Sequence, residues 1–348
     1  MLAEISGQLA AERIIAPAAS EERTEALKSL LSWVAEQARR GVVQHDAHLS
    51  NFLWGESGWF MLDAAGCRIG KVSSRQLAKN LALLLAQVPP IDAEAVLAEG
   101  SEAANLPPRH LVRKAQQHRY EVMLKKTERD CTHYQTVAVA GLRGMCVRSA
   151  HPQLLALLGS GSDGLTEHGR MLKDGGASTV VALDHLGWVV KRYNLKKRRN
   201  QWKVWLGSSR ARRSWRAAHF LQYCGVYTPS PVAYLEDRRT GVAWFISAIH
   251  RGPLLDSVQE YSQLRTEWCA SLTELFILMR MFRWAHGDMK ASNIVLCDAK
   301  AGLIDLDGWR RFRSQRRANR AIDRDKARLL RNWAESKALR EKMIECLN

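Results

Sequence analysis

Alternating apolar and polar positions predict several short strands in the second half of the chain. Residues 178–183 and 188–193 both alternate with the period of two that is typical of half-buried strands. The turn-forming residues Asp184 to Gly187 separate them, which predicts a β-hairpin. A further strand is expected at 242–249, after an extended segment opened by Pro229 to Pro231. The pattern therefore predicts a small β-rich lobe.

Helix-like sequence precedes, interrupts and follows this lobe. It covers residues 27–40, 77–88, 109–129, 208–223 and 264–284. The stretch at 208–223 is strongly basic, whereas 77–88 is mostly apolar and is expected to be a buried helix. No uninterrupted apolar run approaches the roughly 18 residues needed to span a bilayer.

These elements predict three regions. Residues 1–140 form a mostly helical region, residues 141–168 a linker, and residues 169–348 the domain that contains the predicted strands. The segment 159–164 is rich in glycine and serine, which supports the linker because such sequence favours flexible connections. The expected fold class is α+β.

One pattern of polar residues occurs in both larger regions, 1–140 and 169–348. The segment that starts at Gln44 aligns with the segment that starts at His286. In each copy an Asp precedes an Asn by five positions, and a second Asp follows that Asn by twelve positions. The first copy contains Asp46, Asn51 and Asp63, and the second contains Asp288, Asn293 and Asp305. Two patterns with identical spacing indicate a common structural motif.

The residue types of this motif suit phosphoryl transfer, which depends on positioning and charge neutralisation. Asp288 is predicted to be a catalytic residue that orients an acceptor hydroxyl and takes its proton. Asn293 and Asp305 are predicted to hold Mg²⁺, because amide and carboxylate oxygens are the hard ligands that this ion prefers. The phosphates of ATP would complete the coordination shell.

Basic residues and glycines are predicted to contact ATP. Lys290, two residues after Asp288, is expected to be a second catalytic residue that neutralises the transferred phosphate. Lys191 ends a predicted strand and is expected to hold the α- and β-phosphates. Gly175 and Gly176 lie in a turn whose backbone amides are expected to cover the phosphates.

Three of these assignments have competing interpretations. Asp307 is a second candidate for the metal ligand, although its spacing from Asn293 makes Asp305 the better candidate. His286 is interpreted as a structural histidine of the loop rather than as a base. The turn at Gly175 and Gly176 would also suit any β-hairpin.

The charge of the chain favours an anionic partner. There are 52 basic and 35 acidic residues, a formal net charge of +17, and no Asp or Glu occurs from His185 to Tyr234. A second basic cluster consists of Arg310, Arg311, Arg313, Arg316, Arg317 and Arg320. A solvated basic face is the competing interpretation. The long absence of acids favours contact with phosphates on lipid, glycan or nucleic acid.

The cysteines and the N-terminus indicate the compartment. The seven cysteines are scattered without a CxxC pair, which predicts reduced thiols and neither a disulfide framework nor a zinc site. The N-terminus lacks the charged-then-apolar pattern of a secretion signal. A cytoplasmic location is therefore expected, with peripheral contact to a membrane left open.

The second copy closely resembles the lipopolysaccharide core kinase family, which phosphorylates Kdo or heptose sugars. The resemblance rests mainly on residues 286–293 and 303–308 and extends over residues 169–332. It implies a protein-kinase-like bilobal fold with a small β-rich N-lobe and a helical C-lobe, and ATP and Mg²⁺ as cofactors. It also implies that the substrate is an anionic glycolipid, the lipopolysaccharide core. The reaction of this family takes place at the cytoplasmic face of the inner membrane, and the resemblance implies the same location here.

The first copy is similar to the broader kinase and aminoglycoside-phosphotransferase pattern over residues 27–68. His48 replaces the equivalent of Lys290, and Ala65 replaces the equivalent of Asp307. Only about 43 residues precede this copy, too few for a β-lobe of its own. We therefore expect a truncated and inactive C-lobe-like region, either a degenerate scaffold or a part of a longer tandem protein.

One departure from the kinase pattern keeps other functions open. Kinases of this fold pair the strand lysine with a Glu on the next helix, whereas Ser214 stands at that position here. A pseudokinase scaffold in cell-envelope assembly is therefore an alternative, as is a kinase that acts on protein or a small molecule. Nucleic acid is not expected as a partner, because no recognised binding module accompanies the charge.

Overall fold

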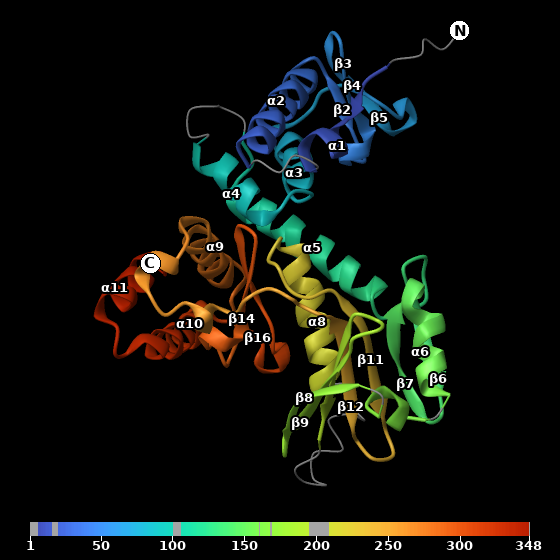
Figure 1. Ribbon diagram of the computed structural model, residues 1–348. Helices are drawn as coiled ribbons and strands as arrows, with labels where there is room; N and C mark the ends of the chain where they lie inside the picture. Colours follow the sequence, from blue (N-terminus) through green and yellow to red (C-terminus); the bar gives the residue numbers. More distant parts are fainter. Residues whose placement is uncertain are drawn as a thin grey trace. The chain divides into compact units, whose positions relative to one another are not determined.

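The chain forms two compact units, Met1–Val122 and Met123–Asn348, each with its own hydrophobic core (Figure 1). The structure is a computed structural model that describes residues 6–15, 20–99, 106–159, 161–167, 169–194 and 209–347. Within these ranges no helix is both long enough and apolar enough to cross a membrane. Part of the acid-free basic stretch, Lys196, Lys197, Arg198, Arg199 and Lys203, lies outside the described residues.

The N-terminal unit is mostly helical. Its helices are α1 (Ala10–Ile15), α2 (Ser20–Arg39), α3 (Ser74–Leu85), α4 (Pro90–Glu99) and α5 (Arg109–Lys126), the last of which continues past the end of the unit. An antiparallel sheet contains β1 (Gln8–Leu9), β3 (Phe52–Gly55) and β4 (Gly58–Met61), and β2 (Val42–Gln44) pairs with β5 (Cys67–Ile69). Apolar side chains three or four positions apart on α2 and α3 form the core, among them Leu27, Leu30, Leu81 and Leu84.

A seven-stranded antiparallel sheet forms the first half of the C-terminal unit. Its strands in spatial order are β6 (Tyr134–Val139), β7 (Leu142–Val147), β11 (Pro231–Asp237), β12 (Ala243–Ala248), β10 (Trp188–Tyr193), β9 (Ser178–Leu183) and β8 (Arg170–Gly175). In β10, Lys191 lies opposite Phe245 of β12 and Val180 of β9, so strands on both sides hold its backbone.

Each face of this sheet is covered by a helix (Figure 1). On one face, Leu154 and Leu158 of α6 (His151–Leu158) join the buried cluster that contains Val181. On the other face, Trp215 of α8 (Arg210–Tyr223) packs with Tyr193. Because successive strand residues point to opposite faces, the alternating pattern supplies both clusters.

The second half of the C-terminal unit is mainly helical. It contains α9 (Thr266–Phe282), α10 (Gln315–Leu330) and α11 (Lys337–Cys346), together with two short hairpins. One hairpin pairs β13 (Trp284–Ala285) with β16 (Arg310–Arg311), and the other pairs β14 (Ile294–Cys297) with β15 (Lys300–Leu303). Phe220 of α8 packs against Trp284 and Trp309, which fixes α8 against this half.

The predicted α+β fold, with a β-rich lobe and a helical lobe, is confirmed. The strands predicted at 178–183 and 188–193 coincide with β9 and β10, and the basic helix coincides with most of its predicted range. The linker predicted at 141–168 is wrong, because β7 pairs with β11 and α6 covers a face of the sheet. The β7 strand is too short and too mixed in polarity to be distinguished from a connection by its sequence alone.

The expectation that the thiols are all reduced is also wrong for one pair. Cys269 on α9 and Cys346 at the end of α11 form a disulfide, with their Cα atoms 5.0 Å apart. The two residues are separated by 77 positions, and α9 packs against α11. The pairing therefore follows from helix packing, which the spacing of the cysteines does not indicate.

Candidate active site

The loop between β13 and β14 holds Asp288 and Asn293 together. The side-chain Nδ2 of Asn293 donates a hydrogen bond to the carbonyl oxygen of Asp288 at 2.8 Å. The backbone N–H of Asn293 donates to the carbonyl oxygen of Lys290 at 2.9 Å, across a single 3₁₀ turn. The spacing of five positions thus closes a small loop. Among the described residues, no hydrogen bond uses the amide oxygen of Asn293, which is free for another ligand.

Both ring nitrogens of the buried His286 form hydrogen bonds. Its Nδ1 accepts a hydrogen bond from the backbone N–H of Asp288 at 3.3 Å, so the ring proton resides on Nε2. Nε2 in turn donates to the carbonyl oxygen of Ile304 at 2.8 Å. The ring therefore ties the Asp288 loop to the strand that precedes Asp305, which supports its interpretation as a structural histidine.

Asp305 lies two residues after the end of β15 in a left-handed backbone conformation, with φ 58° and ψ 56°. Ile294 and Leu303 are paired residues of β14 and β15, so Asn293 and Asp305 leave the hairpin at the same end. The backbone N–H of Ile304 donates to the carbonyl oxygen of Asn293 at 3.0 Å. Non-glycine residues rarely adopt this conformation, and those that do are often found at functional sites.

A close approach of two glycines brings the Asp288 loop against the segment after Asp305. Gly287 has φ +85°, and a Cβ atom at this position would lie 2.6 Å from the carbonyl oxygen of Gly308. Any other side chain would force the two segments apart. The structure therefore requires glycine here so that the Asp288 loop can pack against the segment after Asp305.

Lys191 of β10 forms an ion pair with the carboxylate of Asp305. Burial tends to raise the pKa of the Asp305 carboxyl, but the charge of Lys191 and the hydrogen bond that Lys191 donates outweigh burial and lower that pKa. Asp305 therefore carries its negative charge next to the lysine. The β-rich half and the helical half of the unit meet at this contact.

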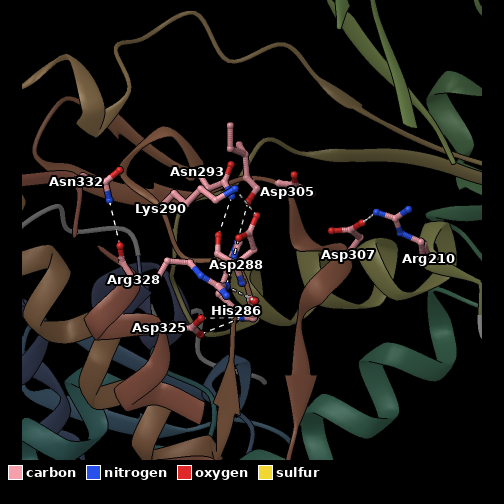
Figure 2. A network of polar contacts seen from close by, with 12 residues as sticks. Arg210, His286, Asp288, Lys290, Asn293, Asp305, Asp307, Asp325, Arg328 and Asn332 are labelled. Carbon is pink, nitrogen blue, oxygen red and sulfur yellow. Dashed lines mark hydrogen bonds and ion pairs between the residues drawn. The ribbon is translucent and has the colours of Figure 1, made fainter. Parts of the chain in front are cut away.

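Asp307 is held by α8. Its carboxylate forms an ion pair with Arg210 (Figure 2). Its carbonyl oxygen accepts a hydrogen bond from Arg213 at 3.0 Å. Burial raises the pKa of the Asp307 carboxyl, although the charge of Lys191 acts in the opposite direction. Arg210 also donates to the carbonyl oxygen of Ala177 at 3.2 Å, and thus joins the β8–β9 turn to the segment after Asp305.

Two cations flank the carboxylate of Asp288 (Figure 2). The ammonium of Lys290 lies 3.1 Å from one carboxylate oxygen, and the guanidinium of Arg328 lies 3.3 Å from the other. Arg328, on α10, also donates to the carbonyl oxygen of Gly287 at 2.6 Å. The arrangement holds the carboxylate in one orientation while leaving it 38% exposed.

A buried carboxylate on α10 binds the backbone of the Asp288 loop. Asp325 of α10 is 2% exposed, and its two carboxylate oxygens accept hydrogen bonds from the backbone N–H of Gly287 at 3.1 and 3.0 Å. A charge-assisted bond of this kind is stronger than a neutral one. The α10 helix therefore positions Asp288 through both Asp325 and Arg328.

The structure brings most of the predicted site residues into one cluster. Asp288, Lys290 and Asn293 share a loop, and Lys191 reaches Asp305 from the sheet. Gly175 and Gly176 are in the β8–β9 turn, which is linked to the cluster only indirectly, through Arg210. The roles of Arg210, Asp325 and Arg328 have no signal in the sequence, since no fixed spacing relates these residues to the motif.

The oxygen ligands of the cluster fit Mg²⁺. Asn293 contributes a free amide oxygen and Asp305 an ionised carboxylate, and both leave the same end of one hairpin. Hard oxygen ligands of this kind suit Mg²⁺, which usually retains water or phosphate oxygens in its remaining positions. Lys191 lies beside them with a charge that suits the phosphates of a nucleotide.

The first copy of the motif has the same local geometry. Asn51 donates from Nδ2 to the carbonyl oxygen of Asp46 at 2.9 Å, and Asp63 has φ 56°. The buried side chain of Gln44, at the position of His286, donates to the carbonyl oxygen of Leu62 at 3.0 Å. The two copies thus share hydrogen bonds from side chains to backbone carbonyl oxygens as well as spacing, although the residues around their carboxylates differ.

Comparisons with known proteins give one family match. The model of the lipopolysaccharide kinase (Kdo/WaaP) family matches residues 167–346. A search of curated proteins found no relative. Among solved structures, the Rio2 kinase–ADP/Mg²⁺–phosphoaspartate complex from Chaetomium thermophilum is 16% identical, with a TM-score of 0.39 over 76% of this chain and 85% of that chain. WbdD bound to the kinase inhibitor LY294002 is 15% identical, with a TM-score of 0.29 over 39% and 32% of the two chains.

Proposed function

Because this chain belongs to the lipopolysaccharide kinase (Kdo/WaaP) family and is an ATP-dependent kinase, we propose that its C-terminal unit phosphorylates a sugar hydroxyl of the lipopolysaccharide core. The observation that carries the proposal is the cluster in which Asp288, Asn293 and Asp305 meet beside Lys191. The partly exposed carboxylate of Asp288 can contact an acceptor. Asn293 and Asp305 offer oxygen ligands for a metal, and Lys191 offers a positive charge for phosphates.

Each residue has a separate role in the proposal. Asp288 orients the acceptor hydroxyl and accepts its proton, and its exposure leaves it accessible to a substrate in solution. Asn293 and Asp305 hold Mg²⁺, which when bound neutralises charge on the phosphates of ATP. Lys290 lies beside Asp288, where it stabilises the negative charge of the transferred group.

The nucleotide is held by the sheet. Lys191 binds the α- and β-phosphates, and the backbone of the turn at Gly175 and Gly176 covers them. Arg210 supports this arrangement, because its contacts with Ala177 and Asp307 keep the turn close to the metal ligands. The proposed partner is an anionic glycolipid, which agrees with the net charge of +17 and with work at the cytoplasmic face of the inner membrane.

A phosphotransfer assay tests the proposal. Purified protein with ATP and Mg²⁺ is supplied separately with lipopolysaccharide core oligosaccharide, with a generic protein acceptor and with an aminoglycoside. We expect labelled phosphate only on the oligosaccharide, and Asp288→Asn to lower the rate by about 10²–10⁴-fold while ATP still binds. Transfer only to another acceptor contradicts the proposed substrate. Absence of ATP binding in folded wild-type protein would instead support a pseudokinase scaffold.

A further inference from the structure

A row of arginines extends along α10 from the Asp288 site. Arg317, Arg320, Arg324 and Arg328 are spaced three or four positions apart in this helix. At 3.6 residues per turn they fall within about 80° of its circumference and extend over about 16 Å of its length. The first three side chains are exposed, whereas Arg328 is 35% exposed and contacts Asp288.

The three exposed arginines of this row lack acidic partners in the described part of the chain. Within the described part of the chain, no ion pair involves Arg317, Arg320 or Arg324. Of the two acids on α10, Asp325 is buried and bound to the backbone of Gly287. The other acid, Asp323, is exposed and lies three positions after Arg320, but within the described residues no ion pair joins the two.

An ordinary solvated helix face does not explain such a row. Like charges three or four positions apart destabilise a helix, whereas alternating charges would stabilise it. The opposite flank of α10 contributes Ala318, Ile322 and Leu329 to the core, so burial accounts for that flank alone. An anionic ligand along the row would turn the unfavourable repulsion into favourable contacts.

We propose that these four residues, the α10 arginine row, bind phosphate or carboxylate groups on the acceptor sugar. The inference rests on the proposed function, because it assigns the acceptor hydroxyl to Asp288. Arg328 of the row contacts Asp288, whereas within the described residues no ion pair joins the row to Asp305, which pairs with Lys191. The acceptor's charged groups, rather than ATP, are therefore the ligand of the row.

Direct binding measurements without ATP test the row. The double variant Arg320→Gln/Arg324→Gln removes two exposed charges and spares Arg328, which positions Asp288. The control Arg238→Gln/Arg239→Gln removes the same charge from the exposed β11–β12 turn. The probe is phosphorylated lipopolysaccharide core oligosaccharide, studied by calorimetry beside its enzymatically dephosphorylated form.

We expect the row variant to bind the phosphorylated oligosaccharide about tenfold more weakly, since each exposed charge contact typically contributes a few-fold. The control variant should bind within twofold of the wild type. Dephosphorylated oligosaccharide should bind wild type and row variant alike, and the KM for ATP should not change. Equal affinity of wild type and row variant for the phosphorylated probe would overturn the inference.

Two further results separate the alternatives. Vesicles of phosphatidylglycerol should bind the row variant and the control variant equally. Selective loss of vesicle binding in the row variant, with oligosaccharide binding intact, contradicts the inference and assigns the row to the membrane. If the wild type binds the oligosaccharide through the row but transfers no phosphate to it, the row stands and the proposed function fails.

Discussion

The hydroxyl of Ser214 on α8 lies 2.9 Å from the hydroxyl of Tyr193 on β10, and both residues are buried. Ser214 occupies the position where a kinase of this fold is expected to have a Glu that pairs with the strand lysine. Here the strand lysine, Lys191, pairs with Asp305 instead. A carboxylate at position 214 is therefore not needed to hold the lysine, and the buried space is filled by a neutral hydrogen bond.

Replacing Ser214 should affect stability and not nucleotide binding. In Ser214→Ala the hydroxyl of Tyr193 loses its partner in a buried site, which costs about 1–3 kcal/mol of unfolding free energy. The KM for ATP should remain within twofold of the wild type. Urea denaturation and initial rates measure the two effects.

Ser314→Ala, at an exposed serine without a side-chain capping bond, is the matched control and should change stability by less than about 0.5 kcal/mol. A large rise in the KM for ATP would show that Ser214 acts on Lys191.

Asp305→Ala should abolish stabilisation of the protein by ATP and Mg²⁺. Ligand at 100 times its dissociation constant stabilises a folded protein by about 2.7 kcal/mol, which thermal unfolding detects as a higher melting temperature. The variant should show no Mg²⁺-dependent rise. Asp63→Ala is the matched control, because Asp63 has nearly the same backbone conformation, with φ 56° against 58°. If the rise persists in Asp305→Ala, Asp305 is not a metal ligand.

The first copy of the motif should be dispensable for phosphotransfer. Asp46→Asn and Asp63→Asn are expected to leave the rate within twofold of the wild type. The physical reason is that His48 and Ala65 replace the cation and the second acid that surround the motif in the C-terminal unit. Initial rates with ATP and core oligosaccharide provide the measurement. A tenfold loss in either variant would mean that the N-terminal unit has a catalytic role.

Stability should fall as the pH decreases below 6.5, because His219 is buried as the neutral imidazole. Burial lowers the pKa of His219 from 6.5 to about 3. The centroid of its ring lies 4.3 Å from the ring centroid of Trp215 and 5.3 Å from that of Tyr134. Between these pH values the unfolded chain binds a proton that the folded chain does not bind. The resulting loss is at most about 1.4 kcal/mol per pH unit.

His219→Phe keeps the aromatic contacts and removes the titrating group. The unfolding free energy of this variant should therefore change less steeply between pH 6.5 and 4 than that of the wild type. Urea denaturation at several pH values measures the slope. An unchanged slope would contradict the assignment of this pH dependence to His219.

Local patterns in the sequence predicted the elements and part of the site. The alternation at 178–183 and 188–193 specified β9 and β10, because a half-buried strand needs that period on its two faces. The spacing of Asp288, Asn293 and Asp305 predicted a common structural motif, which the structure forms with short-range hydrogen bonds to backbone carbonyl oxygens.

Contacts between distant segments were decided only by tertiary structure. Arg328 reaches Asp288 over 40 positions, Arg210 reaches Asp307 over 97, and Cys269 pairs with Cys346 over 77. No local pattern encodes such pairs, since they depend on how helices pack on a sheet and on each other. The sequence by itself therefore determined the chemical groups of the site and their local order. The packing of α8 and α10 decided which charges surround them, because electrostatic interactions depend on distance in space and not along the chain.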